Sequence, residues 1–267
     1  MSITVAIPTH PLYAPLVECA DDVCRRSGFR LLKGTEDECT RWLARNTAEL
    51  ALLTPLGYAS EAYQTDYRII PATALALEGL TYTASVYLRQ GAERLETFAA
   101  LAPHDFLMQM AAAVLSEKFD SFVTLEQAAL SEQEVLQSAE QRYDGIIAYG
   151  FDENQAIVLD VSDEWSDYIQ EPLPMAFWTC RPDDVPAEIE EIVRAMAAPA
   201  LRDEEHIKER MVAGISAERE GRKMWRWSEE VEQALQKTIE MLYYWQYVPT
   251  VSETKVWKRD SSHPLLS

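Results

Sequence analysis

Short apolar runs alternate with amphipathic segments along the first sixty residues. Residues 3–7, 29–32 and 50–53 have the length and composition of strands buried on both faces. Between the first two runs, apolar side chains recur at helical spacing from Leu12 to Val23. The order of strand, helix, strand, helix, strand predicts a doubly wound parallel sheet.

Capping residues mark the expected starts of further helices. Thr35 and Ser131 are each followed by Glu three positions later, which is the capping-box pattern. Residues 204–208 follow Asp203 and carry opposite charges four positions apart, which predicts a charged helix. A long helix is expected over residues 228–247.

Residues 143–180 continue the α/β pattern. Residues 146–148, 156–159 and 175–178 are short apolar runs that predict three more buried strands. Between the last two, Ser162 is expected to cap a short helix. This region therefore predicts a second set of strands and helices.

The same region carries a resemblance to a known family. Its order, DG-apolar-G-D followed by LD-x-S-x-E-W-x-x-Y, P-L-P and A-F-W, resembles the menaquinone-biosynthesis family of the futalosine pathway, which includes chorismate dehydratase. The resemblance covers most of residues 1–200. It implies an α/β, two-lobe type II periplasmic-binding-protein-like fold with a hinge and an interdomain cleft. In this interpretation residues 1–89 and 178–267 form lobe 1, and residues 90–177 form lobe 2.

The charge of the chain excludes some classes of partner. Lys and Arg number 24 against 44 Asp and Glu, so the formal net charge is -20. The sequence has no stripe of Lys and Arg that would displace phosphate counterions. This argues against binding to nucleic acid and against binding to an anionic membrane surface. No apolar run reaches the roughly 18 residues of a membrane span. Residues 1–5 lack the basic and apolar regions of a secretory signal, so a cytoplasmic location is expected.

Metal and cofactor motifs are missing from the sequence. There is no GxGxxG, P-loop, GxSxG or HExxH pattern. The histidines at positions 10, 104, 206 and 263 show no metal spacing with the cysteines. We expect no metal and no cofactor. Reduced, buried thiols are expected for the four cysteines, Cys19, Cys24, Cys39 and Cys180.

The first strand ends at Thr9 and His10, the sheet edge where α/β proteins bind ligands. His10 is the predicted catalytic and ligand-binding residue, because its charge can change near neutral pH. The alternative is a loop histidine held by local hydrogen bonds. The family pattern here resembles N-[TS]-x-P-L, and its Asn is implied in removing the substrate's proton. Thr9 matches this pattern, but Pro8 occupies the Asn position and has no polar side-chain atom.

Other strand ends match the family's ligand-facing loops. Hydroxyls there can bind carboxylates, although β-branched Thr also simply suits a strand. The predicted ligand-binding residues of this group are Thr54, Pro55, Thr81, Thr83 and Ser85.

Two further groups complete the predicted binding site. His104 and Asp105 start a helix expected from near Pro103, and the N–H groups of a helix start attract anions. Asp105 fills the same field with its own charge, so an ordinary helix-start acid is the alternative. The family's I-G-D segment is matched by Tyr149, Gly150 and Asp152. Asp152 is interpreted either as an acid/base group or as a cap of the next turn.

These features predict a cytoplasmic protein that binds a small carboxylated metabolite. By resemblance it would act like chorismate dehydratase, a carbon–oxygen lyase of menaquinone biosynthesis. The alternative is a non-catalytic solute-binding or sensing protein on the same fold, so enzymatic activity stays open. A homodimer contact through Trp225 and Trp227, beside basic residues, is a further hypothesis, with a core position as the alternative.

Overall fold

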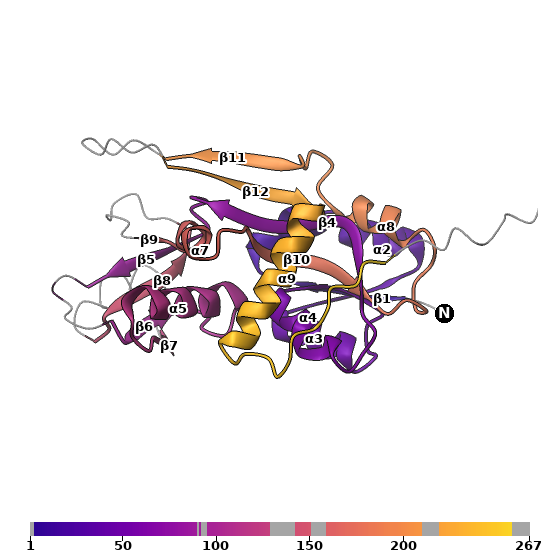
Figure 1. The fold of residues 1–267 in the computed structure, drawn as a ribbon. Helices are drawn as coiled ribbons and strands as arrows, with labels where there is room; N and C mark the ends of the chain where they lie inside the picture. The colour runs from indigo at the N-terminus through magenta and orange to yellow at the C-terminus, as the bar shows by residue number, and fades with distance from the viewer. Residues whose placement is uncertain are drawn as a thin grey trace, which may run out of the picture. The chain divides into compact units, whose positions relative to one another are not determined.

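A computed structural model describes residues 3–89, 91, 95–128, 142–150, 159–209 and 219–257. The chain forms two compact units, whose elements are labelled in Figure 1. Unit 1 consists of Met1–Leu75, Ala176–Asp203 and Trp225–Ser267, and unit 2 of Ala76–Met175 and Glu204–Met224. The predicted lobe ranges stay a prediction; the units differ from them mainly in residues 76–89 and 204–224, which form part of unit 2.

The sheet of unit 1 is built on the apolar runs near the N-terminus. Its strands, in spatial order, are β4 (Arg68–Gly79), β10 (Leu173–Cys180), β3 (Leu50–Leu53), β1 (Thr4–Pro8) and β2 (Arg30–Gly34). The expected parallel arrangement is confirmed for β1 with β2 and β3. In contrast, β10 runs antiparallel to β3. Every residue of β1 and β3 is buried, which explains why these strands are apolar throughout instead of alternating.

The helices of unit 1 pack on this sheet and on one another. They are the 3-10 helix η1 (Pro11–Tyr13), α1 (Ala14–Val17), α2 (Ala20–Ser27), α3 (Glu36–Ala44), α4 (Pro55–Ala62), α8 (Ile189–Met196) and α9 (Glu229–Tyr244). Helix α3 lies against β1, β2 and β3, and α2 lies beside α8 (Figure 1). Helix α9 packs against α4.

Two predicted helix starts in unit 1 are confirmed by their caps. Thr35 Oγ1 accepts a hydrogen bond from the Glu38 N–H at 3.1 Å, and Glu38 Oε2 accepts one from the Thr35 N–H at 2.8 Å. This is the capping box expected before α3. At α9, Ser228 Oγ accepts from the Val231 N–H at 3.2 Å. Both starts follow from side-chain oxygens that satisfy helix N–H groups.

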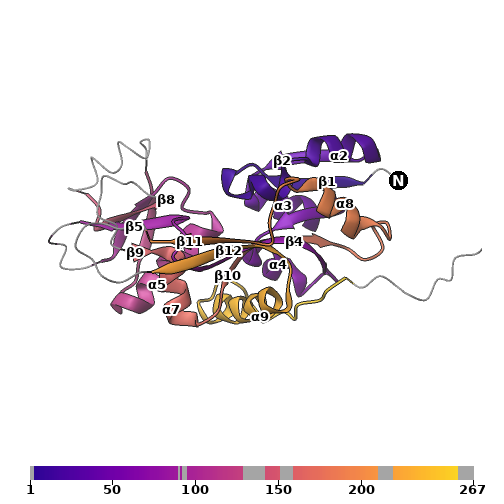
Figure 2. The ribbon, with the colours of Figure 1, turned by 90° about the horizontal axis from the view of Figure 1, so that it is seen from above.

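Unit 2 contains a five-stranded sheet and two described helices. The strands, in spatial order, are β7 (Thr124–Gln127), β6 (Thr97–Ala100), β8 (Gly145–Tyr149), β5 (Ala84–Leu88) and β9 (Leu159–Asp160). Strand β6 is parallel to β7 and β8, whereas β5 is antiparallel to β8 and β9. Helices α5 (Phe106–Phe119) and α7 (Val161–Ile169) pack side by side (Figure 2).

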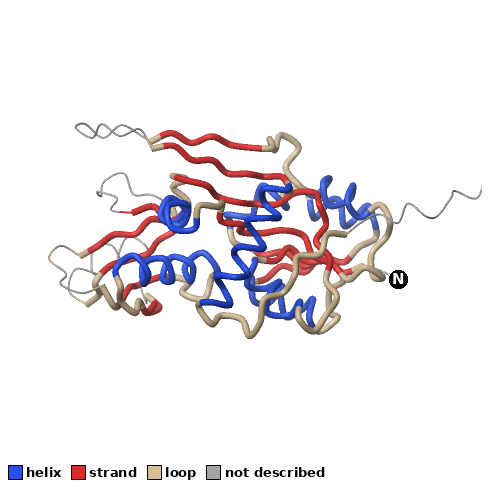
Figure 3. Tube along the Cα trace, in the orientation of Figure 1, coloured by secondary structure: helices blue, strands red, loops and turns tan. Residues whose placement is uncertain are grey.

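The predicted charged helix over residues 204–208 is wrong. These residues form β11 (Glu204–Lys208), which pairs antiparallel with β12 (Glu220–Arg226); the two strands form a ribbon at the edge of a seven-stranded sheet that continues through β4 (Figure 3). The opposite charges pair across strands instead of along a helix. Glu204 meets Arg222 at 3.1 Å, and Lys208 meets Glu220 at 3.3 Å. A partner strand distant in sequence therefore overrides the local i,i+4 signal.

Two helix starts of unit 2 differ from expectation. Helix α5 begins at Phe106, after a turn at residues 101–105, so Pro103 is not its first residue. The cap of α7 is Asp160 and not Ser162, because the Asp160 carboxyl accepts from the N–H groups of Ser162 and Asp163. The predicted helix at 131–141 and most of the predicted strand at 156–159 lie outside the described residues.

None of the helices within the described ranges has the length and apolar content needed to cross a bilayer.

All four cysteines are free thiols. Burial, with a contribution from Asp21, raises the pKa of Cys24 to about 11. Burial also raises the pKa of Cys39 and of Cys180 to about 12. Cys19 is the exception to the expected burial, since it is only half-buried.

Alkylation is expected to distinguish these thiols. Because the thiolate is the nucleophile, iodoacetamide at pH 8 should modify Cys19 in the native protein and leave Cys24, Cys39 and Cys180 unmodified. Denaturation should then allow modification of all four, as counted by intact mass. Cys19→Ser should abolish native labelling, and rapid native labelling of a second cysteine would contradict the burial.

Candidate functional site

The loop after β1 is tied to the end of β2. The Thr9 N–H donates to Gly34 O at 2.8 Å, and the Thr9 hydroxyl donates to the same oxygen at 3.2 Å. Thr9 remains exposed, and His10 beside it is half-buried. The strand end predicted from the sequence therefore places Thr9 and His10 at an accessible turn of unit 1.

His10 acts locally as a helix cap. Its Nδ1 accepts a hydrogen bond from the Leu12 N–H at 3.2 Å, at the start of η1. Its ring stands edge-on to Tyr13, with centroids 6.2 Å apart. An accepting Nδ1 carries no proton, so the proton of the neutral ring is on Nε2. In this arrangement Nε2 is the donor atom of the neutral His10 ring, and Nδ1 is an acceptor.

Pro8 and Thr54 stand at the ends of β1 and β3, where a polar side chain could contact a ligand. Pro8 is the last residue of β1 and provides no polar side-chain atom where the family pattern has Asn. Thr54 follows β3, and its Oγ1 accepts from the Gly57 N–H at 3.2 Å, which caps α4 with Pro55 in its first turn. The cap uses Thr54 as an acceptor, so its hydroxyl hydrogen can still be donated.

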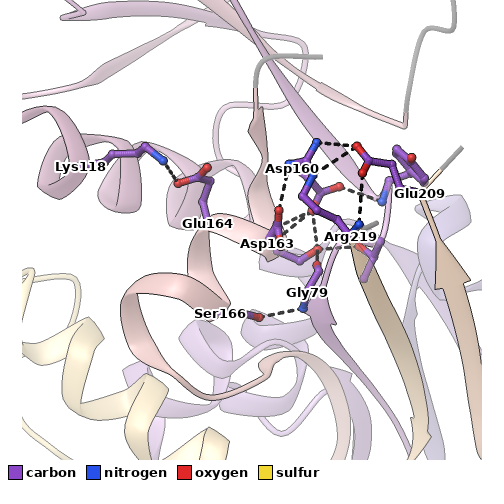
Figure 4. Close-up of polar contacts among 11 residues, drawn as sticks. Gly79, Lys118, Asp160, Asp163, Glu164, Ser166, Glu209 and Arg219 are labelled. Atoms are coloured by element: carbon purple, nitrogen blue, oxygen red, sulfur yellow. Dashed lines mark hydrogen bonds and ion pairs between the residues drawn. The ribbon is translucent and has the colours of Figure 1, made fainter. Parts of the chain in front are cut away.

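Unit 2 is organised around a buried carboxyl group that the sequence analysis missed. Asp160 is 0% exposed and lies in a cluster with Gly79, Asp163 and Arg219 (Figure 4). Its Oδ1 accepts from the N–H groups of Ser162 at 3.0 Å and Asp163 at 3.1 Å, and its Oδ2 accepts from the Tyr82 N–H at 2.8 Å. Burial raises the pKa of Asp160, and these hydrogen bonds oppose that rise.

Three hydroxyl groups connect to this carboxyl group. The Ser162 hydroxyl lies 2.7 Å from Asp160 Oδ1 and 2.8 Å from Gly79 O. Thr81 Oγ1 lies 2.7 Å from Ser162 Oγ and 2.8 Å from Thr83 Oγ1. The predicted ligand hydroxyls of Thr81 and Thr83 are thus buried parts of a hydrogen-bonded chain, and ligand contact by them stays a prediction.

Ser85 and Gly150 are brought together by the pairing of β5 with β8. The Ser85 hydroxyl donates to Gly150 O at 2.7 Å, and the Gly150 N–H donates to Thr83 O at 2.8 Å. Gly150 has φ +77°, a conformation that favours glycine, and no atom of a described residue would meet an added Cβ within 4 Å. The structure therefore assigns Gly150 a turn role.

Tyr149 and Asp105 form a pair that was not anticipated. The Tyr149 hydroxyl donates to Asp105 Oδ2 at 3.0 Å. Asp105 occupies the cap position of α5, but its side chain makes no capping hydrogen bond. His104 is exposed, and its carbonyl accepts from Gln109 Nε2 at 3.0 Å. Asp152 lies outside the described residues.

The aromatic residues considered for a homodimer contact are in the core. Trp225 and Trp227 are 6% and 8% exposed, and Trp227 stacks edge-on with Phe177 at 5.7 Å between centroids. The core interpretation is confirmed for both rings, and the homodimer stays a prediction. Among the described residues, no group of three or more His, Cys, Asp or Glu side chains is arranged to hold a metal ion.

Comparisons with known proteins identify the fold. No protein-family model and no curated protein matches the chain. Protein AF1704 from Archaeoglobus fulgidus superposes with a TM-score of 0.59 at 15% identity, covering 92% of this chain and 98% of that one. An ABC transporter from Parabacteroides distasonis gives 0.55 at 8% identity, covering 97% and 99%. The periplasmic aliphatic sulphonate binding protein SsuA from Escherichia coli gives 0.52 at 8% identity, covering 98% and 94%.

These structural similarities confirm the predicted fold class. The chain has an α/β, two-lobe type II periplasmic-binding-protein-like fold. At such low sequence identity the similarity concerns the fold and not the ligand.

Proposed function

We propose that this chain binds a small carboxylated metabolite with hydrogen-bond donors at its strand ends. The fold suggests the class of function by analogy, because SsuA binds aliphatic sulphonates, which are organic anions. The accessible turn after β1 carries the proposal, because α/β proteins bind ligands at such strand ends. There the neutral His10 ring, whose Nδ1 accepts the Leu12 N–H, would donate its Nε2–H to a ligand oxygen next to the exposed Thr9.

The second candidate function is a lyase reaction like that of chorismate dehydratase. The motif resemblance over residues 144–178 favours it. Two observations favour binding without turnover. Pro8 stands in the position of the family's proton-abstracting Asn, and the Nδ1 of His10, which would otherwise accept a proton, already accepts the Leu12 N–H.

Chorismate separates the two candidates. The purified protein is incubated with chorismate, and 3-enolpyruvyl-benzoate is sought by absorbance and mass. Thermal denaturation is followed in parallel across a panel of carboxylated metabolites. We expect a panel member to raise the melting temperature, since a ligand at 100 times its Kd adds about 2.7 kcal/mol. We expect no product; sustained turnover would establish the lyase, and a panel without any shift would contradict carboxylate binding.

A pair of substitutions tests the role assigned to His10. His10→Asn keeps an acceptor near the Leu12 N–H, because Asn is a good capping residue, but removes the Nε2–H donor. His10→Ala removes both. We expect both variants to bind the panel ligand about tenfold more weakly or worse, the cost of one hydrogen bond to a charged group. Only His10→Ala should also destabilise unit 1. If His10→Asn binds the panel ligand with wild-type affinity, His10 has a structural role only and the binding role is wrong.

A further inference from the structure

Unit 1 contains a pocket that shares no residue with the strand-end site. Its volume is about 360 Å³. The wall is formed by Ala72 and Thr73 of β4, by residues 194–195, 197–199 and 201–203 at and beyond the end of α8, and by Trp225 and Arg226 of β12. This volume is at the lower end of the range of small-molecule sites.

The charge of this pocket is opposite to that of the chain. Three of its lining side chains are positive, Arg194, Arg202 and Arg226, and one is negative, Asp203. The whole chain has 44 acidic against 24 basic residues. An anion needs a locally positive region to bind to so acidic a protein, and this group of guanidinium side chains provides one. Arg binds carboxylate and phosphate with two parallel hydrogen bonds.

The three guanidinium groups are not equally engaged. Arg226 pairs with Asp203 at 2.9 Å, and Arg194 pairs with Glu190 at 2.5 Å. Arg202 is exposed and makes no hydrogen bond or ion pair with another described residue. Arg202 is therefore the cation of the pocket whose charge is not already matched.

Apart from Thr73, the remaining wall is apolar. Trp225 is only 6% exposed, and Leu201 and Ala197 line the same pocket. Two carbonyl groups at the end of α8 are already used as acceptors, since Arg194 O accepts from the Ala197 N–H and Met196 O accepts from the Cys19 N–H. A ligand would thus find an apolar surface next to positive charge.

We propose that this pocket binds a small organic anion that has an apolar body and a carboxylate or phosphate group. Arg202 contacts the anionic group, and the apolar body lies against Trp225 and Leu201. The site is separate from the proposed carboxylate site near His10, and the two proposals fail independently.

Calorimetry and NMR with phenyl phosphate test the proposal. Phenyl phosphate should bind saturably and shift the backbone amide signals of Ala197, Ala198 and Trp225. Inorganic phosphate, which lacks the apolar body, and benzyl alcohol, which lacks the charge, should each bind at least about tenfold more weakly. Raised salt should weaken binding. Absence of saturable binding, or shifts that avoid these three amides, would overturn the proposal.

Two variants and a matched control locate the site. Arg202→Ala should weaken phenyl phosphate binding about tenfold or more, the worth of a hydrogen bond to a charged group. Ala195→Trp, at an exposed position of the wall, should block the pocket. Arg45→Ala removes the same charge from an exposed position at the end of α3 and should leave binding unchanged. If Arg202→Ala and Arg45→Ala weaken phenyl phosphate binding equally, the effect is one of net charge and the proposal is wrong. His10→Asn should leave phenyl phosphate binding unchanged.

Discussion

Replacing Asp160 with alanine is expected to destabilise unit 2 by about 3 kcal/mol. The substitution leaves the buried N–H group of Ser162 and the part-buried N–H groups of Tyr82 and Asp163 without their Asp160 acceptor. Each unsatisfied buried donor costs about 1–3 kcal/mol, and a lost helix cap about 1 kcal/mol. Removal of a carboxyl group whose burial raises its pKa offsets part of this sum.

The same hydrogen bonds hold an uncommon backbone conformation. Tyr82 has φ +52°, in the left-handed region that costs non-glycine residues roughly 1–2 kcal/mol. Its N–H is held by Asp160 Oδ2, and its neighbours Thr81 and Thr83 carry the hydroxyl chain that continues to Ser162. Loss of Asp160 should therefore release the segment that leads into β5.

Hydrogen exchange measures the effect in unit 2 alone. Amides of β5 and α7 should exchange faster in Asp160→Ala, while those of β1 and β3 in unit 1 should not change. Asp160→Asn keeps one acceptor oxygen for the α7 cap, so its amides should lose less protection from exchange than those of Asp160→Ala. Asp167→Ala is the control, because Asp167 is an exposed acid on the same helix and its loss should cost within about 0.5 kcal/mol. Equal protection in Asp160→Ala and Asp167→Ala would show that the carboxyl group is dispensable.

The elements that could be predicted are those whose signal is local. β1 and β3 are buried at every position, so burial alone makes them apolar. The capping box of Thr35 and Glu38 lies within four residues, and its geometry is determined by those residues. In contrast, residues 204–208 pair with β12 across a connection that includes residues 210–218, and no local pattern encodes that partner.

The candidate site was predicted less well, because strand-end polar residues have two uses. A hydroxyl after a strand can contact a ligand or can satisfy the backbone of the next element. Thr54 caps α4, Ser85 donates to Gly150 O, and Thr81 contacts Ser162. The chain's own backbone competes for the atoms assigned to a ligand, and residue type alone does not decide between the two uses. Asp160 did carry a signal, an acidic residue directly between a strand and a helix.

Gly221→Ala is expected to separate the β11–β12 ribbon from the rest of unit 2. An added Cβ would lie 2.2 Å from Leu80 O, 2.5 Å from Leu80 N and 2.6 Å from Glu78 O. All three are backbone atoms, so no flexible side chain can move away. Gly79, at the end of β4, lies on the other side of this close contact with β12. It has φ +61°, and an added Cβ would lie 2.4 Å from Glu220 O. Two glycines thus permit an approach of backbones that any side chain would prevent.

The cost of Gly221→Ala should reach about 3 kcal/mol, the upper range for overpacking. The direct measurement is exchange of the Leu80 amide, which donates to Glu220 O at 3.1 Å and should lose its protection. Gly91→Ala is the matched control, because Gly91 has φ +76° but no atom of a described residue within 4 Å of an added Cβ. It should cost only the roughly 1–2 kcal/mol of left-handed strain. Full Leu80 protection in Gly221→Ala would mean that the ribbon can move away without loss, and the close approach would then have no role in holding unit 2 together.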